Sequence, residues 1–187
     1  MGCLFSLPGI PCLYYGTEQG LSGGGSSSEW VREALWGKDD AFSQNSIYFQ
    51  AIQRLSLVRD AQPALRYGRS YYRPISGDGV HFGVSTNAPG IVSFSRILSE
   101  QEVLIVANTN TQNTWTGAVI VDEGINPVGK QFRVLFSNQG QFETPGLVIE
   151  RPAGSVEVTE IDGGVSNGPL HVISIKLLPM EIQILGK

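Results

Sequence analysis

From about Arg69 to the end of the chain, apolar residues recur at every second position, in short runs separated by turn residues. A period of two places apolar side chains on one face of each strand, so such strands have to cover one another. The 23 glycines and 10 prolines provide turn residues along the chain. This pattern predicts a mainly β fold, an antiparallel β-sandwich.

Ten strands are predicted in this part, with turn signals such as Gly77-Asp78-Gly79 between them. The run 103–107 is apolar throughout and is predicted to lie in the middle of a sheet. The ten predicted strands are residues 70–75, 80–85, 90–96, 102–108, 115–121, 132–137, 147–150, 155–161, 172–177 and 181–185.

The first 68 residues follow a different pattern, that of a strand, a loop and a helix. Residues 12–15 are a short apolar run that ends before Gly16, which is typical of a buried parallel strand. A loop rich in glycine and serine follows over residues 21–28. A helix is predicted next, with Ser43 or Asn45 as its N-cap, an end before Pro63, and apolar residues at helical spacing, namely Ile47, Phe49, Ile52, Leu55 and Val58.

The composition argues against several classes of partner. The net charge is −4 at pH 7, lysine and arginine together number only 13, and no basic run is present, so no nucleic acid is expected as a partner. No apolar run approaches the roughly 18 residues of a membrane-spanning helix, so no membrane partner is expected either. A neutral polyol such as a glucan needs no strong field of either sign. The sequence leaves the compartment open.

Neither a metal site nor a cofactor is predicted. His81 and His171, the only histidines, are far apart in sequence and have neither the spacing of metal ligands nor a partnered base. They are interpreted as strand residues with satisfied side chains. The sequence has no phosphate-binding or dinucleotide-binding motif. Cys3 and Cys12 are interpreted as two buried small apolar side chains, not as a disulfide.

Several segments resemble the α-amylase family, glycoside hydrolase family 13, in the order in which that family has them. The first runs from Pro8 to Gly20 and is similar to the family's eighth barrel strand and its exit loop. Taken together, the segments cover essentially the whole chain. The others are residues 31–36 (an Arg-x-x-x-Trp segment), 55–68 (the end of the last barrel helix), 91–96 with 103–108 (early strands of the C-terminal β-sandwich, domain C) and 178–181 (its last turn).

The resemblance implies two parts, a fragment of the catalytic (β/α)8 barrel over residues 1–68 and domain C over residues 69–187. It also implies that the parent acts on α-glucosidic linkages of starch-like glucans or oligosaccharides. The family's retaining mechanism uses paired carboxylates, which lie after the fourth, fifth and seventh barrel strands. No position of this sequence matches them, so no catalytic residue is carried over. The chain is therefore expected to be a truncated enzyme that is inactive alone.

Three residues, Glu18, Arg32 and Trp36, are the candidate substrate contacts. Glu18 lies at the C-terminal end of the predicted strand, which is where a barrel enzyme places its site. Trp36 has a ring that could stack on a sugar. A different interpretation stays open, in which Glu18 orders the loop through Arg32 or backbone amides and Trp36 fills space at the barrel end.

A free-standing carbohydrate-binding or assembly module is the alternative function. An exposed Trp115 with Tyr71 and Tyr72 nearby would form a glucan platform, whereas a core Trp115 would not. The N-terminal part raises a further question, because a lone barrel strand lacks neighbours for its backbone groups. It is expected to pack its helix on the sandwich, to pair with a second copy as a homodimer, or to be poorly ordered.

Overall fold

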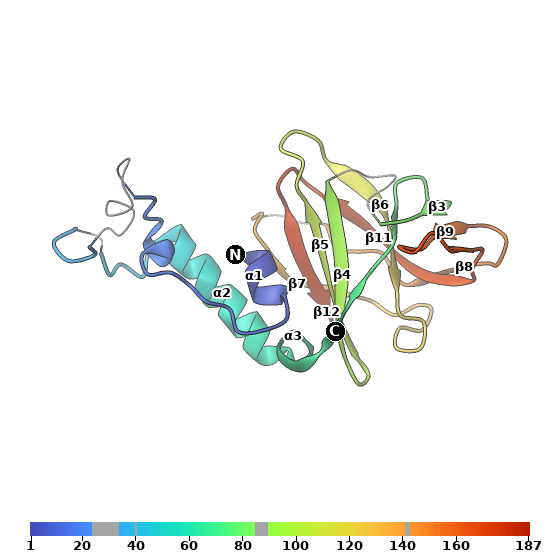
Figure 1. Cartoon of the computed structure of the whole chain (residues 1–187), viewed down its shortest axis with the longest axis horizontal. Coiled ribbons are helices and arrows are strands. Elements are labelled where there is room, and N and C mark those ends of the chain that lie inside the picture. Colours follow the sequence, from blue (N-terminus) through green and yellow to red (C-terminus); the bar gives the residue numbers. More distant parts are fainter. Residues whose placement is uncertain (24–33, 40, 85–89, 141–142) are drawn as a thin grey trace.

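The alternating runs form two facing antiparallel sheets, which confirms the predicted β-sandwich (Figure 1). The structure, a computed structural model, describes residues 1–23, 34–39, 41–84, 90–140 and 143–187. The first sheet has five strands in the order β1 (Arg69–Tyr72), β4 (Ile91–Leu98), β5 (Gln101–Asn108), β12 (Ile182–Gly186) and β7 (Arg133–Ser137). The second sheet has four strands in the order β2 (Ile75–Ser76), β6 (Trp115–Val121), β11 (Leu170–Leu177) and β8 (Ile149–Arg151).

A third, small sheet consists of β10 (Val165–Ser166), β9 (Glu157–Thr159) and β3 (His81–Phe82). Strands β3 and β9 pair in parallel, and β10 was not predicted from the sequence. Phe82 and Val158 pack on Val172 of the second sheet, so the third sheet covers that sheet's outer side. The predicted strand over residues 80–85 extends into residues outside the described ones.

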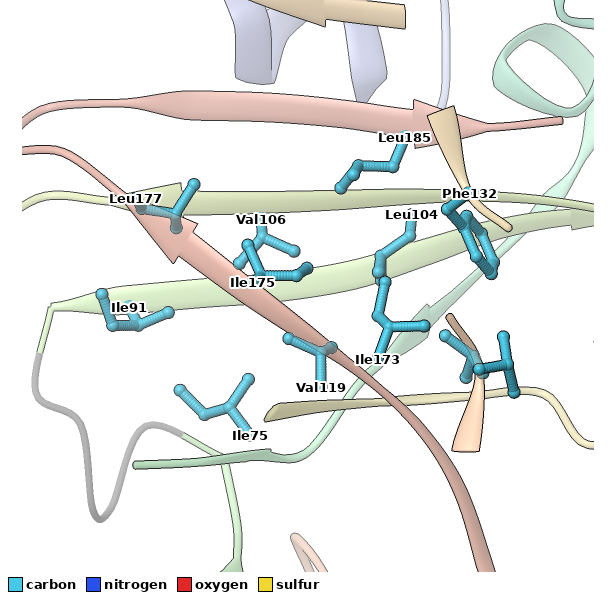
Figure 2. Packing of buried hydrophobic residues seen from close by; sticks show 12 residues of the cluster. Ile75, Ile91, Leu104, Val106, Val119, Phe132, Ile173, Ile175, Leu177 and Leu185 are labelled. Atoms are coloured by element: carbon cyan, nitrogen blue, oxygen red, sulfur yellow. The ribbon is translucent and has the colours of Figure 1, made fainter. Parts of the chain in front are cut away.

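The main core lies between the first and second sheets. Leu104 and Val106 on β5 face Ile173 and Ile175 on β11 (Figure 2). All four side chains are buried. Burial of one such side chain contributes about 1.5–3 kcal/mol relative to leaving it in water. These contacts hold the two sheets of the sandwich together.

Three helices, α1 (Gly2–Ser6), α2 (Ile47–Ala61) and α3 (Pro63–Tyr67), cover the other face of the five-stranded sheet (Figure 1). Val103 and Ile105 of β5 point to these helices, whereas Leu104 and Val106 point to the second sheet. Both faces of β5 are therefore covered, which explains its unbroken apolar run. The helical cluster joins residues 1–68 to the sandwich; the division of the chain at residue 68 stays a prediction.

The N-terminal segment adopts the first of its three expected arrangements, with its helices packed on the sandwich. Phe5 of α1 and Leu55 of α2 are buried with Phe94 of β4 and Ile184 of β12 in one cluster. Within the described residues, no helix is long and apolar enough to cross a membrane.

The strand predicted over residues 12–15 is wrong. Residues 10–14 have no regular structure, and a turn at residues 15–16 leads into the short 3-10 helix η1 (Thr17–Gln19). A parallel strand needs a neighbouring strand for its backbone groups, and the described part of the chain places none beside this segment. Cys12 is consequently exposed, and so is Cys3 on α1, so the prediction of two buried cysteines is also wrong.

The helix predicted around Leu55 is confirmed, but its N-cap differs from the prediction. Ser46 caps α2, because its Oγ accepts a hydrogen bond from the backbone N–H of Tyr48 at 3.1 Å. Ser43 instead accepts from the backbone N–H of Asn45 in the preceding loop. The helix ends at Ala61, and proline then occupies the first turn of α3.

Candidate functional site

Glu18 lies on a turn that is fixed to the start of α2. Gly16 and Gly20 flank η1 with φ values of 85° and 74°, a region that side chains rarely adopt. Thr17 donates from Oγ1 and from its backbone N–H to the carbonyl oxygen of Tyr14, at 2.6 and 3.2 Å. The ring of Tyr48 lies so close that a Cβ on Gly20 would be 2.4 Å from it. The turn therefore holds the half-buried Glu18 at a defined place.

Trp36 is 87% exposed and lines an open hollow of about 440 Å³. Phe42 shares this hollow and is itself exposed, with Lys38 and Asp39 beside it. The indole ring is thus free to stack on a ligand. Arg32, the third candidate contact, lies outside the described residues. Substrate binding by Glu18, Arg32 and Trp36 stays a prediction.

Arg59 of α2 is a buried cation that the sequence analysis did not single out. Its Nη1 donates to the carbonyl oxygens of Phe5 and Leu65 at 2.7 and 2.8 Å, and its Nη2 donates to that of Gly9 at 2.5 Å. Two of these carbonyls lie near the C-terminal ends of α1 and α3, where helix carbonyls carry partial negative charge. The side chain therefore joins three segments of the N-terminal part.

Arg96 of β4 extends this arrangement into the sandwich. It is 1% exposed, and its two terminal nitrogens donate to the carbonyl oxygens of Ser6 and Gly68, each at 2.7 Å. Burial lowers the pKa of Arg96, and the neighbouring charge of Arg59 lowers it further. An arginine side chain nevertheless stays charged at neutral pH. We call Arg59 and Arg96 together the arginine clamp.

A second buried polar cluster surrounds Glu102 of β5, whose side chain is 0% exposed. Its Oε1 accepts a short hydrogen bond from Ser95 Oγ. Arg73 Nη2 lies 2.8 Å from the same oxygen as an ion pair, although the angle is not that of a hydrogen bond. Arg73 also donates from Nε to Ser95 Oγ at 2.8 Å. The carboxylate is thus paired and hydrogen-bonded, which buried charges require.

The other oxygen of Glu102 connects the two large sheets. It accepts from the backbone N–H of Asp122 at 3.0 Å and from the side-chain amide of Asn126. Lys130 donates to Asn126 Oδ1 at 2.6 Å. His171 of β11 donates from Nδ1 to the Asn126 carbonyl oxygen at 2.8 Å, so its strand position with a satisfied side chain is confirmed. This cluster is structural in its geometry, since each group is held by other protein groups.

Asp78 and His81 form an exposed ion pair in the turn between β2 and β3. Asp78 Oδ2 lies 2.8 Å from His81 Nδ1, and Oδ1 accepts from Ser76 Oγ and from two backbone N–H groups. The hydrogen bond from His81 holds the pKa of Asp78 well below its usual value. The same hydrogen bond, with the Asp78 charge, raises the pKa of His81. The pair orders the turn.

Replacement of Asp78 by Asn is expected to bring the pKa of His81 down toward 6.5. The raised pKa means that the pair stabilises the fold fully below pH 6.5 and loses this contribution as the pH rises through the folded pKa. The pKa of Asp78 is lowered in the folded state, so the contribution of Asp78 to stability is present above pH 3.8 and is lost as the pH falls through the folded pKa. An NMR titration of both histidine rings, assigned with a His171→Gln variant, measures this. An unchanged His81 pKa in the Asn variant would contradict the assignment.

Trp115, Tyr71 and Tyr72 do not form one aromatic platform. Trp115 packs against the main core, and its ring lies within 2.3 Å of where a Cβ on Gly117 would be. Tyr71 and Tyr72 are consecutive residues of β1, so they point to opposite faces of the sheet. Trp115 is half-buried at the border of the main core, which agrees only in part with its interpretation as a core residue.

Across the described ranges, no group of three or more His, Cys, Asp or Glu side chains is arranged to hold a metal ion. The structure brings together three groups of side chains: the arginine clamp, the Glu102 cluster, and the exposed aromatic residues Trp36 and Phe42. The first two hold the N-terminal helices and both sheets in place. The aromatic residues are the part of the surface that a sugar could contact.

The fold defined above is that of an antiparallel β-sandwich with a helical layer on one sheet, and known proteins share it. No family model matches the chain. A cyclomaltodextrin glucanotransferase of Geobacillus stearothermophilus is 28% identical over 116 residues, which are 62% of this chain and 14% of that protein. One of Bacillus sp. (strain 17-1) is 27% identical over 160 residues, which are 86% of this chain and 16% of that protein.

Solved structures give the same picture. A debranching enzyme of Nostoc punctiforme matches with a TM-score of 0.61 and 22% identity, over 100% of this chain and 30% of that one. An α-amylase of H. orenii matches with a TM-score of 0.58 and 18% identity, over 100% of this chain and 34% of that one. The chain resembles the C-terminal part of an α-amylase-family protein, which confirms the resemblance seen in the sequence. It spans less than a fifth of the length of the curated relatives it matches.

Proposed function

We propose that this chain is the C-terminal portion of an α-amylase-family glycoside hydrolase that acts on α-glucosidic linkages of starch-like glucans or oligosaccharides. Support comes from the curated relatives, whose name denotes the transfer of glucan chains. The motif order of the sequence agrees with it. The sandwich then has a structural role, because the arginine clamp fixes the N-terminal helices to it.

One observation carries this proposal: the N-terminal part exposes several large apolar side chains. On α2, Leu55 is 1% exposed, whereas Leu57 and Ile47 are 64% and 73% exposed. Ile10 is 95% exposed. A surface helix has one apolar face, and further exposed apolar groups mark an interaction surface. We expect the rest of the catalytic barrel to cover these side chains.

Two alternatives to this proposal can be tested by experiment. A second copy of the chain would cover the same side chains as a homodimer, which size-exclusion chromatography with light scattering detects as twice the monomer mass. A free-standing carbohydrate-binding or assembly module is the alternative function. It would need its own sugar contacts and no barrel encoded upstream. Reading the DNA just upstream of Met1 distinguishes it, because an in-frame barrel there supports the proposed parent.

The chain alone is expected to have no glycosidase activity. A retaining glycosidase needs two carboxyl groups about 5–5.5 Å apart, and no residue of this sequence matches the family's catalytic positions. Hydrolysis of a maltooligosaccharide aryl glycoside by the purified chain measures this, with an intact α-amylase as positive control. Turnover that survives repeated purification would overturn the proposed role of this chain.

A further inference from the structure

Tyr72 lies at the edge of the helix-covered sheet face, at a place where the helices leave it exposed. It lies on the edge strand β1 and pairs in register with Phe94 of β4, so both side chains point to the helix side. Phe94 is buried there, whereas Tyr72 is 65% exposed. Cys3 of the short helix α1 (Gly2–Ser6) lines a hollow beside Tyr72 without covering it. Within the described residues, the Tyr72 side chain has no hydrogen bond or ring contact.

Two hollows meet at this ring. One, of about 370 Å³, lies toward α1 and is lined by Leu7, Pro8 and Val92 as well as Tyr72. The other, of about 520 Å³, lies toward the turn after β9 and is lined by Thr159, Glu160 and Ile161 with Tyr72. Figure 1 shows α1 and β9 on opposite sides of β4. Tyr72 therefore forms a ridge between an apolar hollow and a second hollow that combines apolar side chains with the polar Thr159 and Glu160.

This combination has the chemistry of a sugar site. An aromatic ring takes up the apolar C–H face of a pyranose, and a few polar groups fix its hydroxyls. Here Tyr72 supplies the ring, and Glu160 and Thr159 supply a carboxylate and a hydroxyl. Each hollow is within the roughly 300–1,000 Å³ of ligand pockets. An anionic ligand is disfavoured, because the carboxylate of Glu160 would repel it.

We propose that Tyr72 is the centre of a binding site for a linear α-glucan, with sugar units in the two hollows and one unit stacked on the ring. The choice of an α-glucan rests on the proposed function. The shape agrees with it, since a chain that crosses a ridge between two hollows has to bend. An α-1,4-linked glucan is curved, whereas a β-1,4-linked glucan is straight and suits a flat platform.

Titration calorimetry of the intact chain with maltoheptaose tests the site. We expect millimolar or tighter binding, with weakening by roughly tenfold in Tyr72→Ala, as for truncation of a central aromatic contact. Tyr72→Phe keeps the ring and is expected to bind within about twofold of the native chain. Tyr67→Ala is the matched control, because Tyr67 is 70% exposed on α3 and should have no effect. Circular dichroism confirms that each variant is folded.

Several outcomes would overturn the site: no binding of maltoheptaose, equal binding by Tyr72→Ala, equal loss in Tyr67→Ala, or equally tight binding of cellohexaose. These outcomes are independent of the test of the proposed function. If binding fails while an in-frame barrel lies upstream, only the Tyr72 site is wrong. If binding at Tyr72 holds and no barrel lies upstream, the parent enzyme is wrong and the site belongs to a free-standing module.

Discussion

Replacement of Arg96 by Met is expected to lower the free energy of unfolding by about 3 kcal/mol. The side chain donates two hydrogen bonds of 2.7 Å, and bonds from a charged donor contribute roughly 1.5–3 kcal/mol each. Methionine fills a similar space but leaves the carbonyl oxygens of Ser6 and Gly68 without this donor. Removal of a buried charge offsets part of the loss. The loss of the two hydrogen bonds outweighs the gain from removing the charge, because the carbonyl oxygens of Ser6 and Gly68 stay buried without a donor.

The loss should be concentrated at α1. A helix of five residues is not stable by itself, so α1 depends on its anchors. Urea unfolding gives the global change, and hydrogen exchange of the Phe5 and Leu7 amides, which bond to carbonyls one turn earlier, reports on α1. Arg69→Met is the matched control, since Arg69 is exposed on β1. Unchanged exchange at Phe5 in the Arg96 variant would show that the clamp does not hold the helix.

The clamp also shows which features the sequence allowed us to predict. The strands that contain Arg96 and Glu102 were predicted, because a period of two is a local signal that side chains impose on each strand. The burial of their charges was not predicted. Arg96 bonds to carbonyls 90 and 28 residues away in sequence, and no local pattern specifies such partners. One feature of the sequence could have indicated the buried charge of Arg96: a charged residue lies within a predicted strand that is mostly apolar. Such a residue needs a partner if it is buried.

The error at residues 12–15 has the same origin. An apolar run indicates that a segment can be buried in a sheet, but the burial requires neighbouring strands. The candidate contacts were predictable to different degrees. Glu18 and Trp36 were singled out by resemblance, and the structure shows how a turn and a hollow present them. The surroundings of Tyr72 were not predictable, because its hollows combine residues from the N-terminus, β4 and the turn after β9.

Replacement of Glu102 by Gln is expected to destabilise the fold by about 3–5 kcal/mol, the usual effect of removing one partner of a buried ion pair. The amide has nearly the shape of the carboxylate, so the packing should persist. It removes the nearer counter-charge of Arg73, at 2.8 Å, and leaves only the more exposed Asp122, whose Oδ2 lies 3.6 Å from Arg73 Nη2. In the variant, an NH2 group replaces one of the two carboxylate oxygens. An NH2 group cannot accept the hydrogen bond that Oε1 now accepts from Ser95 Oγ, or the one that Oε2 accepts from Asn126. Urea unfolding measures the loss.

A double-mutant cycle separates the pair from the rest of the cluster. Arg73→Met alone leaves Glu102 as a buried unpaired carboxylate, so it should be as harmful as Glu102→Gln. The double variant Arg73→Met/Glu102→Gln has no buried unpaired charge, since Asp122, the other partner of Arg73, is partly exposed. We expect it to be more stable than the sum of the single losses predicts, by roughly 1–3 kcal/mol. Glu100→Gln, at the exposed turn before β5, is the control and should be neutral. Strictly additive losses would mean that the two charges do not interact, so that the cluster joins the sheets through its neutral hydrogen bonds alone.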